Sequence, residues 1–472
     1  MQVHEYAGLD AAELAALVAQ EEVTPADLRR CAEEAADRAA AVNAVVALHD
    51  DAPEPAEGPL RGVPTLVKDL FHGREGWPCG NGSRLAPDWT VPRRSLLVAR
   101  AEAAGLSFVG RSTTSEFGIM GTTETVACGP TRSPFAPDRM AGGSSGGAAA
   151  AVGAGIVPVA LASDGGGSIR IPASACGTVG LKPSRGRVPW GLRLHEPLLG
   201  WAVQFAVSRS VRDSALFLDL LAGPAPYDAE GLPRADAPFA DAARGGSSPL
   251  RIAWTATPWS GHDPDPVVRA ATEATAHELE ALGHVVEEAA PAFSWEAFLA
   301  AMSTVWAATN AQSIDGFARA MGAEVSDETL EATTLAMVEQ GRALHARDLL
   351  DALDVEVALT ATMAGFLSEH DVLLTPTLGA LPPEIGRYDP AAPNPLHDTF
   401  ADWSRWETFL PLFNVTGQPA ISLPLHQTPD GVPIGMQLVG GFGREAMLLR
   451  LAADLEEALP WRDRRPAVWA GA

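Results

Sequence analysis

The sequence predicts an α/β fold in which all 472 residues form one domain. Three observations support this prediction. Segments with helical periodicity alternate along the chain with short apolar runs. Those runs are continuously apolar, as strands buried on both faces are. Pro and Gly are spread throughout, so no stretch is typical of a linker between domains, and no internal repeat is present.

The N-terminal segment is predicted to form helices followed by a surface loop. Asp10 is placed to cap a short amphipathic helix. Thr24, Pro25 and Asp27 are then the N-cap, the N1 proline and an acidic N3 residue of a second helix, which we expect to end near Ala41. A stretch rich in Pro, Glu and Asp forms the loop.

A short apolar strand over residues 60–69 comes next and places Lys68 near its end. Helices and strands then alternate to the end of the sequence. Residues 289–367 are strongly helical and poor in glycine, which indicates an insertion or a cap over a functional site. We expect helices at residues 95–104, 266–282, 349–368 and 444–458, and strands at residues 107–110, 250–254, 284–287, 371–375, 420–425 and 434–439.

Composition restricts the partners and the compartment. With 59 acidic and 34 basic residues the formal net charge is −25, so we expect neither a nucleic acid nor a membrane surface as a partner. The N-terminus has no basic segment before a long apolar run, and no apolar run reaches the ~18 residues of a membrane span, so a cytoplasmic protein is predicted. The four cysteines form no CxxC motif, and no His, Asp and Cys cluster has metal-ligand spacing, so we predict inert thiols, no metal and no cofactor.

Two glycine-rich loops, each holding a serine, dominate residues 141–170. The first, GGSSGG at 142–147, carries Ser144 and is open to three interpretations: a linker, a phosphate cradle or a G-x-S-x-G nucleophile elbow. A linker does not lead into an apolar segment, a Walker loop needs a lysine after its second glycine, and an elbow needs a preceding strand. In the second loop three glycines precede Ser168, and their N–H groups can converge on an oxyanion; the alternative is a plain tight turn.

A serine nucleophile needs a base, which is usually histidine. His72 and His195 lie nearest to the loops in sequence, but neither has a distinctive setting, so we expect surface or supporting roles for them. A lysine can replace histidine if burial lowers its pKa by about three units, a differential interaction of roughly 4 kcal/mol. The chain has two lysines, Lys68 and Lys182, and Lys68 follows an apolar run. Lys68 is therefore the candidate base; an exposed lysine at a strand end is the alternative.

The sequence also resembles a known protein family. The motifs that carry the resemblance appear in order along the chain: GVP at 62–64, KD at 68–69, EFG at 116–118, GPTR at 129–132, GGSSGG at 142–147, DGGGSIR at 164–170, GLKP at 180–183 and NVTGQPA at 414–420. This series is similar to the amidase signature family, mainly over residues 60–210 and again over 371–460. The resemblance implies the amidase signature fold, a large mixed twisted β-sheet sandwiched by α-helices.

The same resemblance implies a division of the single domain. Residues 1–59 would supply N-terminal helices and residues 60–210 the signature core. Residues 211–370 would form a variable, largely helical region on the substrate side, and residues 371–472 would complete the core.

The resemblance also implies a Ser-cisSer-Lys triad. Ser168 would be the nucleophile that becomes acylated, and Ser144 would be a bridging serine that follows a cis peptide. Lys68 would be the base, which takes a proton through Ser144 and returns it to the leaving amine. Other roles implied are oxyanion-hole N–H groups from Gly165, Gly166, Gly167 and Ser168, bracing of that loop by Asp164 and Arg170, and assistance to the lysine by Ser145.

One branch of the family is especially similar. Many members carry Thr or Ile at the position of Gly165 and Thr at that of Ser163, whereas this chain resembles the 6-aminohexanoate-cyclic-dimer hydrolases at both positions and over residues 82–85 and 202–213. We therefore predict an amidohydrolase that cleaves a carboxamide C–N bond through an acyl-enzyme. Its partner would be a small-molecule amide: a cyclic or linear oligoamide, an aryl amide or an aliphatic amide.

Two alternatives stay open. The first is the A subunit of a tRNA-dependent amidotransferase, a glutaminase, which the acidic composition and Gly165 disfavour. The second, more remote, is a non-catalytic nucleotide-binding protein that uses the glycine loops. The choice between a monomer and a homodimer is also open.

Overall fold

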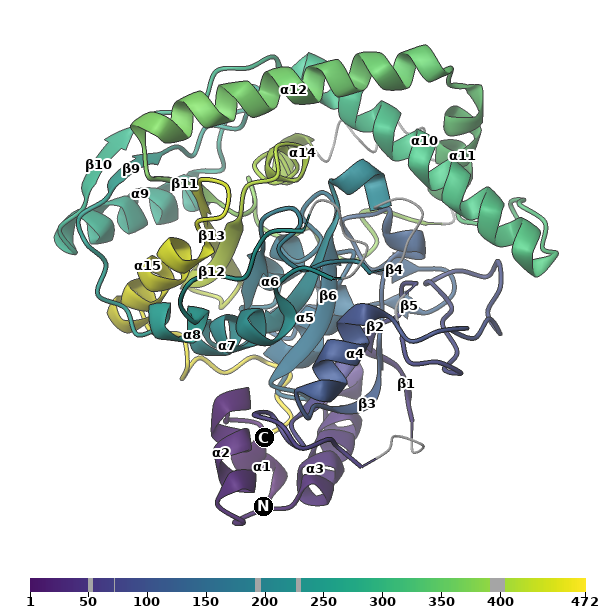
Figure 1. The fold of residues 1–472 in the computed structure, drawn as a ribbon, viewed down its shortest axis with the longest axis vertical. Coiled ribbons are helices and arrows are strands. Elements are labelled where there is room, and N and C mark those ends of the chain that lie inside the picture. Colours follow the sequence, from purple (N-terminus) through teal and green to yellow (C-terminus); the bar gives the residue numbers. More distant parts are fainter. Residues whose placement is uncertain (50–53, 72, 192–196, 226–230, 391–403) are drawn as a thin grey trace.

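The computed structural model describes residues 1–49, 54–71, 73–191, 197–225, 231–390 and 404–472 (Figure 1). Its centre is a mixed 11-stranded sheet with the strand order β1-β3-β2-β6-β8-β7-β12-β13-β11-β9-β10. Helices flank the sheet, which confirms the predicted fold class. The strands are β1 (Val45–Leu48), β2 (Pro64–Lys68), β3 (Ser107–Ser112), β6 (Val159–Asp164), β7 (Val179–Lys182), β8 (Val203–Ser208), β9 (Arg251–Trp254), β10 (Val285–Glu288), β11 (Val372–Pro376), β12 (Ala420–Gln427) and β13 (Pro433–Gly440), with a separate hairpin of β4 (Glu124–Thr125) and β5 (Gly129–Pro130).

The N-terminal helices are capped as their sequences predict. The Asp10 side chain accepts the N–H of Glu13 at the start of α2 (Ala11–Ala19), and Thr24 accepts the N–H of Asp27 at the start of α3 (Pro25–Arg38). Helix α3 ends three residues earlier than expected, and a 3₁₀ turn over Ala40–Val42 follows it. The other helices are α1 (Val3–Tyr6), α4 (Leu96–Ala103), α5 (Gly146–Gly153), α6 (Arg170–Ala175), α7 (Val211–Leu221), α8 (Phe239–Ala242), α9 (Pro266–Ala281), α10 (Trp295–Met321), α11 (Ala332–Ala343), α12 (Ala346–Glu369), α14 (Leu412–Val415) and α15 (Glu445–Ala458).

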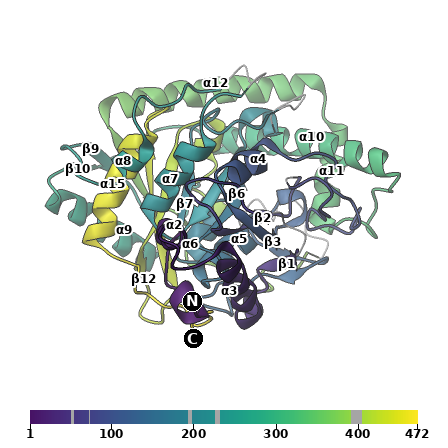
Figure 2. The same ribbon diagram turned by 60° about the horizontal axis from the view of Figure 1, so that its bottom comes forward.

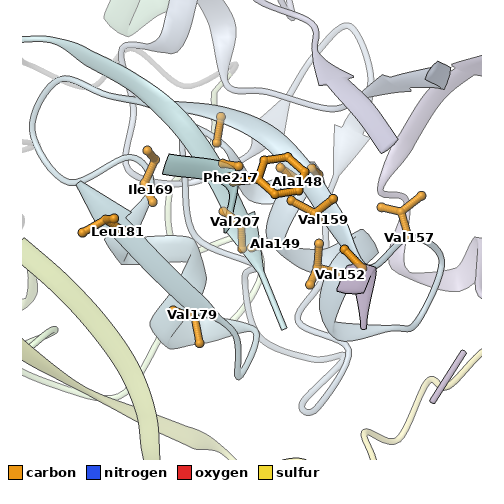
Figure 3. Packing of buried hydrophobic residues seen from close by; sticks show 14 of the residues in the cluster. Ala148, Ala149, Val152, Val157, Val159, Ile169, Val179, Leu181, Val207 and Phe217 are labelled. Atoms are coloured by element: carbon orange, nitrogen blue, oxygen red, sulfur yellow. The ribbon is translucent and has the colours of Figure 1, made fainter. Parts of the chain in front are cut away.

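The segment between the two glycine-rich loops forms α5 followed by β6. Its alanines are completely buried, and their small side chains let the helix pack closely on the sheet. Figure 3 shows Ala148, Ala149 and Val152 of α5 beside Val159 of β6 and Val207 of β8 in the main apolar cluster. Both glycine-rich loops are therefore joined to elements of the main apolar cluster.

Helices α11 and α12 each pack on α10, and the three helices form a layer of their own. Figures 1 and 2 show α10 and α12 at the end of the molecule opposite the two termini. Residues 289–367 are thus largely helical, as predicted. Among the described helices, none combines the length and the apolar character needed to cross a bilayer.

Candidate active site

The site begins where two parallel strands end side by side. Strand β2 pairs in parallel with β6, with Thr65 opposite Val159, so Lys68 at the end of β2 lies near Ser163 at the end of β6. The Lys68 amine donates to the hydroxyl oxygen of Ser144 at 2.7 Å and to that of Ser163 at 3.0 Å. The structure therefore joins the predicted base to the predicted bridging serine.

Lys68 lies in surroundings that favour its neutral form. Its side chain is 1% exposed. Burial lowers the pKa of the Lys68 amine from its ordinary value of 10.5 to about 7, against the opposing influence of the Asp164 carboxylate. A large share of this amine is thus unprotonated near neutral pH and can accept a proton. The second lysine, Lys182 of β7, is also completely buried and donates to the carbonyl of Pro183 at 3.1 Å.

The first glycine-rich loop is held by its backbone. The peptide bond between Gly143 and Ser144 is cis, as the resemblance implies. The Ser115 N–H donates to the carbonyl of Ser144 at 3.3 Å, and the Thr123 hydroxyl donates to the carbonyl of Gly142 at 2.9 Å. The Ser144 hydroxyl is consequently fixed beside the Lys68 amine.

The second loop lies against the first. The Ser145 N–H donates to the carbonyl of Ser168 at 3.2 Å, and Ser144 and Ser168 line the same cavity. Within the described part of the chain, the N–H groups of Gly165, Gly166 and Ser168 donate to no other group. These three N–H groups, on Ser168 itself and on two residues close before it in sequence, are thus free of other acceptors among the described residues, a condition that donors to an oxyanion must meet.

Gly167 departs from the expectation for the oxyanion hole. Its N–H donates to the Asp164 carboxylate at 2.7 Å, so this donor is already committed within the loop. The inclusion of Gly167 among the oxyanion donors is therefore corrected. Gly167 has φ +134°, a conformation that L side chains rarely adopt, and this accounts for glycine at the position.

Asp164 and Arg170 form a buried ion pair that braces the loop. Two guanidinium nitrogens of Arg170 donate to the two carboxylate oxygens at 2.9 and 3.0 Å. Asn414 adds a donor to Asp164 at 2.9 Å and accepts from Arg170 at 2.6 Å, and Gln437 accepts from Arg170 at 2.7 Å. Burial tends to raise the pKa of Asp164, but the Arg170 charge and hydrogen bonds lower it to about 2, so the carboxylate is ionised.

Ser145 reaches the lysine only indirectly. Its hydroxyl donates to the carbonyl of Ser163 at 3.1 Å, and it is the Ser163 hydroxyl that contacts Lys68. Neither Ser163 nor Asn414 is among the site residues that the sequence predicts. The usable signals were that Ser163 precedes Asp164 on a strand and that Asn414 opens the NVTGQPA motif. His72 and His195 lie outside the described residues.

The two serines open onto a cavity of about 590 Å³. One wall is apolar, and helix α10 adds an uncharged polar wall. No Asp, Glu, Lys, Arg or His side chain is present among the described residues that line it. The aromatic lining residues are Phe71, Phe117, Trp190 and Trp306, and the polar ones on α10 are Thr309, Asn310, Gln312 and Ser313. Among the described residues, no group of three or more His, Cys, Asp or Glu side chains is placed to hold a metal ion.

Comparison with known proteins points to one family. A sequence model of the amidase family matches residues 14–449. The chain is 37% identical over 424 residues to a 6-aminohexanoate-cyclic-dimer hydrolase of Paenarthrobacter ureafaciens, covering 88% of this chain and 86% of that protein. It is 35% identical over 420 residues to an acylamidase of Rhodococcus erythropolis, covering 87% and 84%. A solved structure of 6-aminohexanoate cyclic dimer hydrolase matches with a TM-score of 0.92 at 34% identity, covering 98% of this chain and 99% of that one.

Proposed function

Because this chain belongs to the amidase family, whose members hydrolyse carbon–nitrogen bonds other than peptide bonds, we propose that it cleaves small neutral amides through an acyl-enzyme on Ser168. The observation that carries the proposal is the 2.7 Å contact between the Lys68 amine and the Ser144 hydroxyl, at the base of a cavity that Ser168 also lines. A buried amine with a pKa of about 7 beside a serine is an effective general base near neutral pH.

The contact between Lys68 and Ser144 supports the following proton path. The neutral Lys68 amine accepts the Ser144 hydroxyl proton while Ser144 accepts that of Ser168, and the Ser168 oxygen attacks the amide carbon. The tetrahedral oxyanion is stabilised by the N–H groups of Gly165, Gly166 and Ser168. The intermediate collapses, the C–N bond breaks, and the proton returns through Ser144 to the leaving amine. Water then hydrolyses the ester by the same route, which regenerates Ser168 and releases the carboxylic acid.

The cavity supports an uncharged substrate. Its described lining combines aromatic side chains with neutral polar groups and offers no opposite charge to an ionised ligand. Cyclic 6-aminohexanoate dimer and aryl acylamides are neutral molecules of the kind that fit such a lining. Free glutamine carries an ammonium and a carboxylate at neutral pH, so the lining gives no support to the glutaminase alternative. No observation favours the nucleotide-binding alternative.

The proposal is tested by mapping the nucleophile and measuring the preference for charge. A fluorophosphonate probe is expected to modify Ser168 in the wild type and to leave Ser168→Ala unmodified, as read by peptide mass mapping. Ser313→Ala is the matched control, because Ser313 lines the same cavity on α10. The wild type should hydrolyse 4′-nitroacetanilide or cyclic 6-aminohexanoate dimer and should leave glutamine intact. A serine adduct in Ser168→Ala would refute the nucleophile, and preferential glutamine hydrolysis would refute the substrate class.

A further inference from the structure

The part of the oxyanion loop that lacks polar restraints is Gly165–Gly166. The Asp164 carboxylate binds the N–H groups of Gly167 and Ile169, at 2.7 and 3.2 Å, and thereby fixes the end of the loop. No described group binds the N–H of Gly165 or of Gly166. Glycine is conformationally permissive, so the peptide planes here can rotate at little cost and turn their N–H groups away from the Ser168 hydroxyl.

Backbone conformation does not explain glycine at positions 165 and 166, since neither has a φ in the left-handed region. Space explains it. A Cβ on Gly165 would lie 2.7 Å from Leu198 Cδ1 and 3.3 Å from Trp306 Cη2. A Cβ on Gly166 would lie 3.4 Å from Met302 Cε and 3.5 Å from Trp306 Cη2. The benzene edge of one indole therefore occupies the volume beside both glycines.

Trp306 is itself firmly held. It is 4% exposed and belongs to the apolar cluster that α10 forms with its neighbours. Further along the same helix, Phe317 packs between Phe71 and Phe117, with ring centroids 5.9 and 6.0 Å apart. Helix α10 is thus anchored to the core on the far side of the cavity, and the large rigid indole is a firm support for the loop.

We infer that Trp306 is a positioning residue for catalysis, whose indole edge packs on Gly165 and Gly166 and holds their N–H groups toward the reacting carbonyl. This inference rests on the proposed role of the loop as an oxyanion hole. Helix α10 would then contribute to catalysis in two ways, because it forms one wall of the cavity and also restrains the Gly165–Gly166 loop. Gly165 lacks a Cβ because Leu198 and the indole leave little room for one, and Gly166 lies within van der Waals range of the same indole.

The test combines Gly165→Ala and Trp306→Phe with their double variant, and adds Trp306→Ala. Two control variants are matched. Gly365 lies on α12 outside the cavity lining, and a Cβ there meets nothing within 4 Å, so Gly365→Ala adds a methyl without a clash. Trp295→Phe replaces an indole on α10, the helix that carries Trp306, with a smaller ring at a position outside the cavity lining. The readouts are kcat and KM for 4′-nitroacetanilide, the fluorophosphonate inactivation rate, and thermal unfolding to confirm that each variant is folded.

Trp306→Ala is expected to lower kcat and the inactivation rate by about tenfold or more, since one oxyanion donor is worth ~10²–10³ in kcat. KM should change by less than about threefold, because the restraint acts on the transition state. The double variant Gly165→Ala/Trp306→Phe should lose less kcat than the product of the two single fold-reductions. The reason is that the new methyl fills the space that the indole edge leaves. Both control variants should stay within about twofold of the wild type.

A rise in KM with an unchanged kcat in Trp306→Ala would make Trp306 a binding wall only and would overturn the inference. Independent, multiplying effects of Gly165→Ala and Trp306→Phe would overturn it as well. If Trp306→Ala does not fold, the double-variant comparison decides the question. Ser168→Ala is measured alongside: if it retains activity, the proposed function fails, whereas its inactivity combined with multiplying effects refutes only the role of Trp306.

Discussion

The backbone N–H of Ser145 donates to the backbone carbonyl of Ser168 at 3.2 Å, and this bond joins the two glycine-rich loops. The residue that follows the proposed bridging serine, Ser144, is thereby bonded to the proposed nucleophile. Helix α5 begins at Gly146, so the register between the loops is set by main-chain groups at the start of a buried helix. Side-chain substitutions at Ser144 or Lys68 can therefore be interpreted as changes in chemistry on an intact framework.

The first prediction concerns pH. Lys68 must be neutral to accept a proton, and its pKa is lowered to about 7. We expect kcat/KM for a neutral amide to rise as pH increases through about 7 and to level off above it. The measurement is a pH–rate profile with 4′-nitroacetanilide, whose own charge does not change over this range. A profile that falls through neutrality would contradict the assignment of Lys68 as base.

The second prediction separates catalysis from stability at the same residue. Lys68→Met keeps the size of the side chain and removes the amine, so kcat should fall by roughly 10²–10⁴. Between pH about 7 and 10.5 the unfolded wild type binds a proton on this amine that the folded state lacks, so its stability rises with pH over that window. At pH 6 the folded wild type holds a buried ammonium that Lys68→Met does not have.

Urea denaturation at pH 6 and at pH 9.5 checks this sign. Lys68→Met should gain stability relative to the wild type at pH 6, and the gain should shrink at pH 9.5, which serves as the internal control. The opposite result would be a loss of stability in Lys68→Met, relative to the wild type, that is larger at pH 6 than at pH 9.5. That result would show that burial does not disfavour the charged amine.

Ser163 gives the third prediction. Its hydroxyl accepts a hydrogen bond from the Lys68 amine at 3.0 Å. Ser163→Ala removes an acceptor that favours the protonated amine, so the kinetic pKa should move to lower pH, and kcat should fall ~2- to 10-fold through looser positioning of Lys68. Ser163→Thr retains the hydroxyl and should restore both quantities. Equal profiles for the alanine and threonine variants would exclude this contribution.

The fourth prediction concerns Asn414, which bridges the buried Asp164–Arg170 pair. Asn414→Ala leaves buried partners unsatisfied and should lower the free energy of unfolding by about 1–3 kcal/mol. Asn414→Asp should be worse, since it places a second buried carboxylate against Asp164. Both variants loosen the support of the loop and should lower kcat. Denaturant titration and steady-state kinetics test this, with Asn43→Ala as a control amide that bonds backbone carbonyls away from the cavity.

Local signals made much of the fold and the centre of the site predictable. Asp10 and Thr24 mark helix starts by chemistry within three residues of the cap, so those starts were correct. Lys68 was identifiable because it is one of two lysines and follows an apolar strand. The glycine pattern around Ser144 and Ser168 identified both loops, since their small residues are contiguous in sequence.

What escaped prediction depends on contacts between distant segments. The N–H of Gly167 is committed to Asp164 by the turn of the loop, which the letters DGGGS do not specify. Ser163 contacts Lys68 only because β2 and β6 are parallel neighbours. Trp306 lies about 140 residues beyond Gly165, on a helix whose docking is decided by tertiary packing. Periodicity locates that helix but not the face that meets the loop.

The burial of both lysines determines how the protein surface reacts with acylating groups. Both lysine amines of the folded chain are buried, so arginine supplies the strongly basic side chains of the described surface, and guanidinium groups are poor nucleophiles toward esters and activated acids. If acyl-enzymes form on Ser168 as proposed, the folded protein thus offers them no surface lysine, on the same molecule or on a neighbouring copy, to which the acyl group could transfer. Succinimidyl esters should likewise leave Lys68 and Lys182 of the native protein unmodified and label both once the core unfolds, as read by peptide mass mapping.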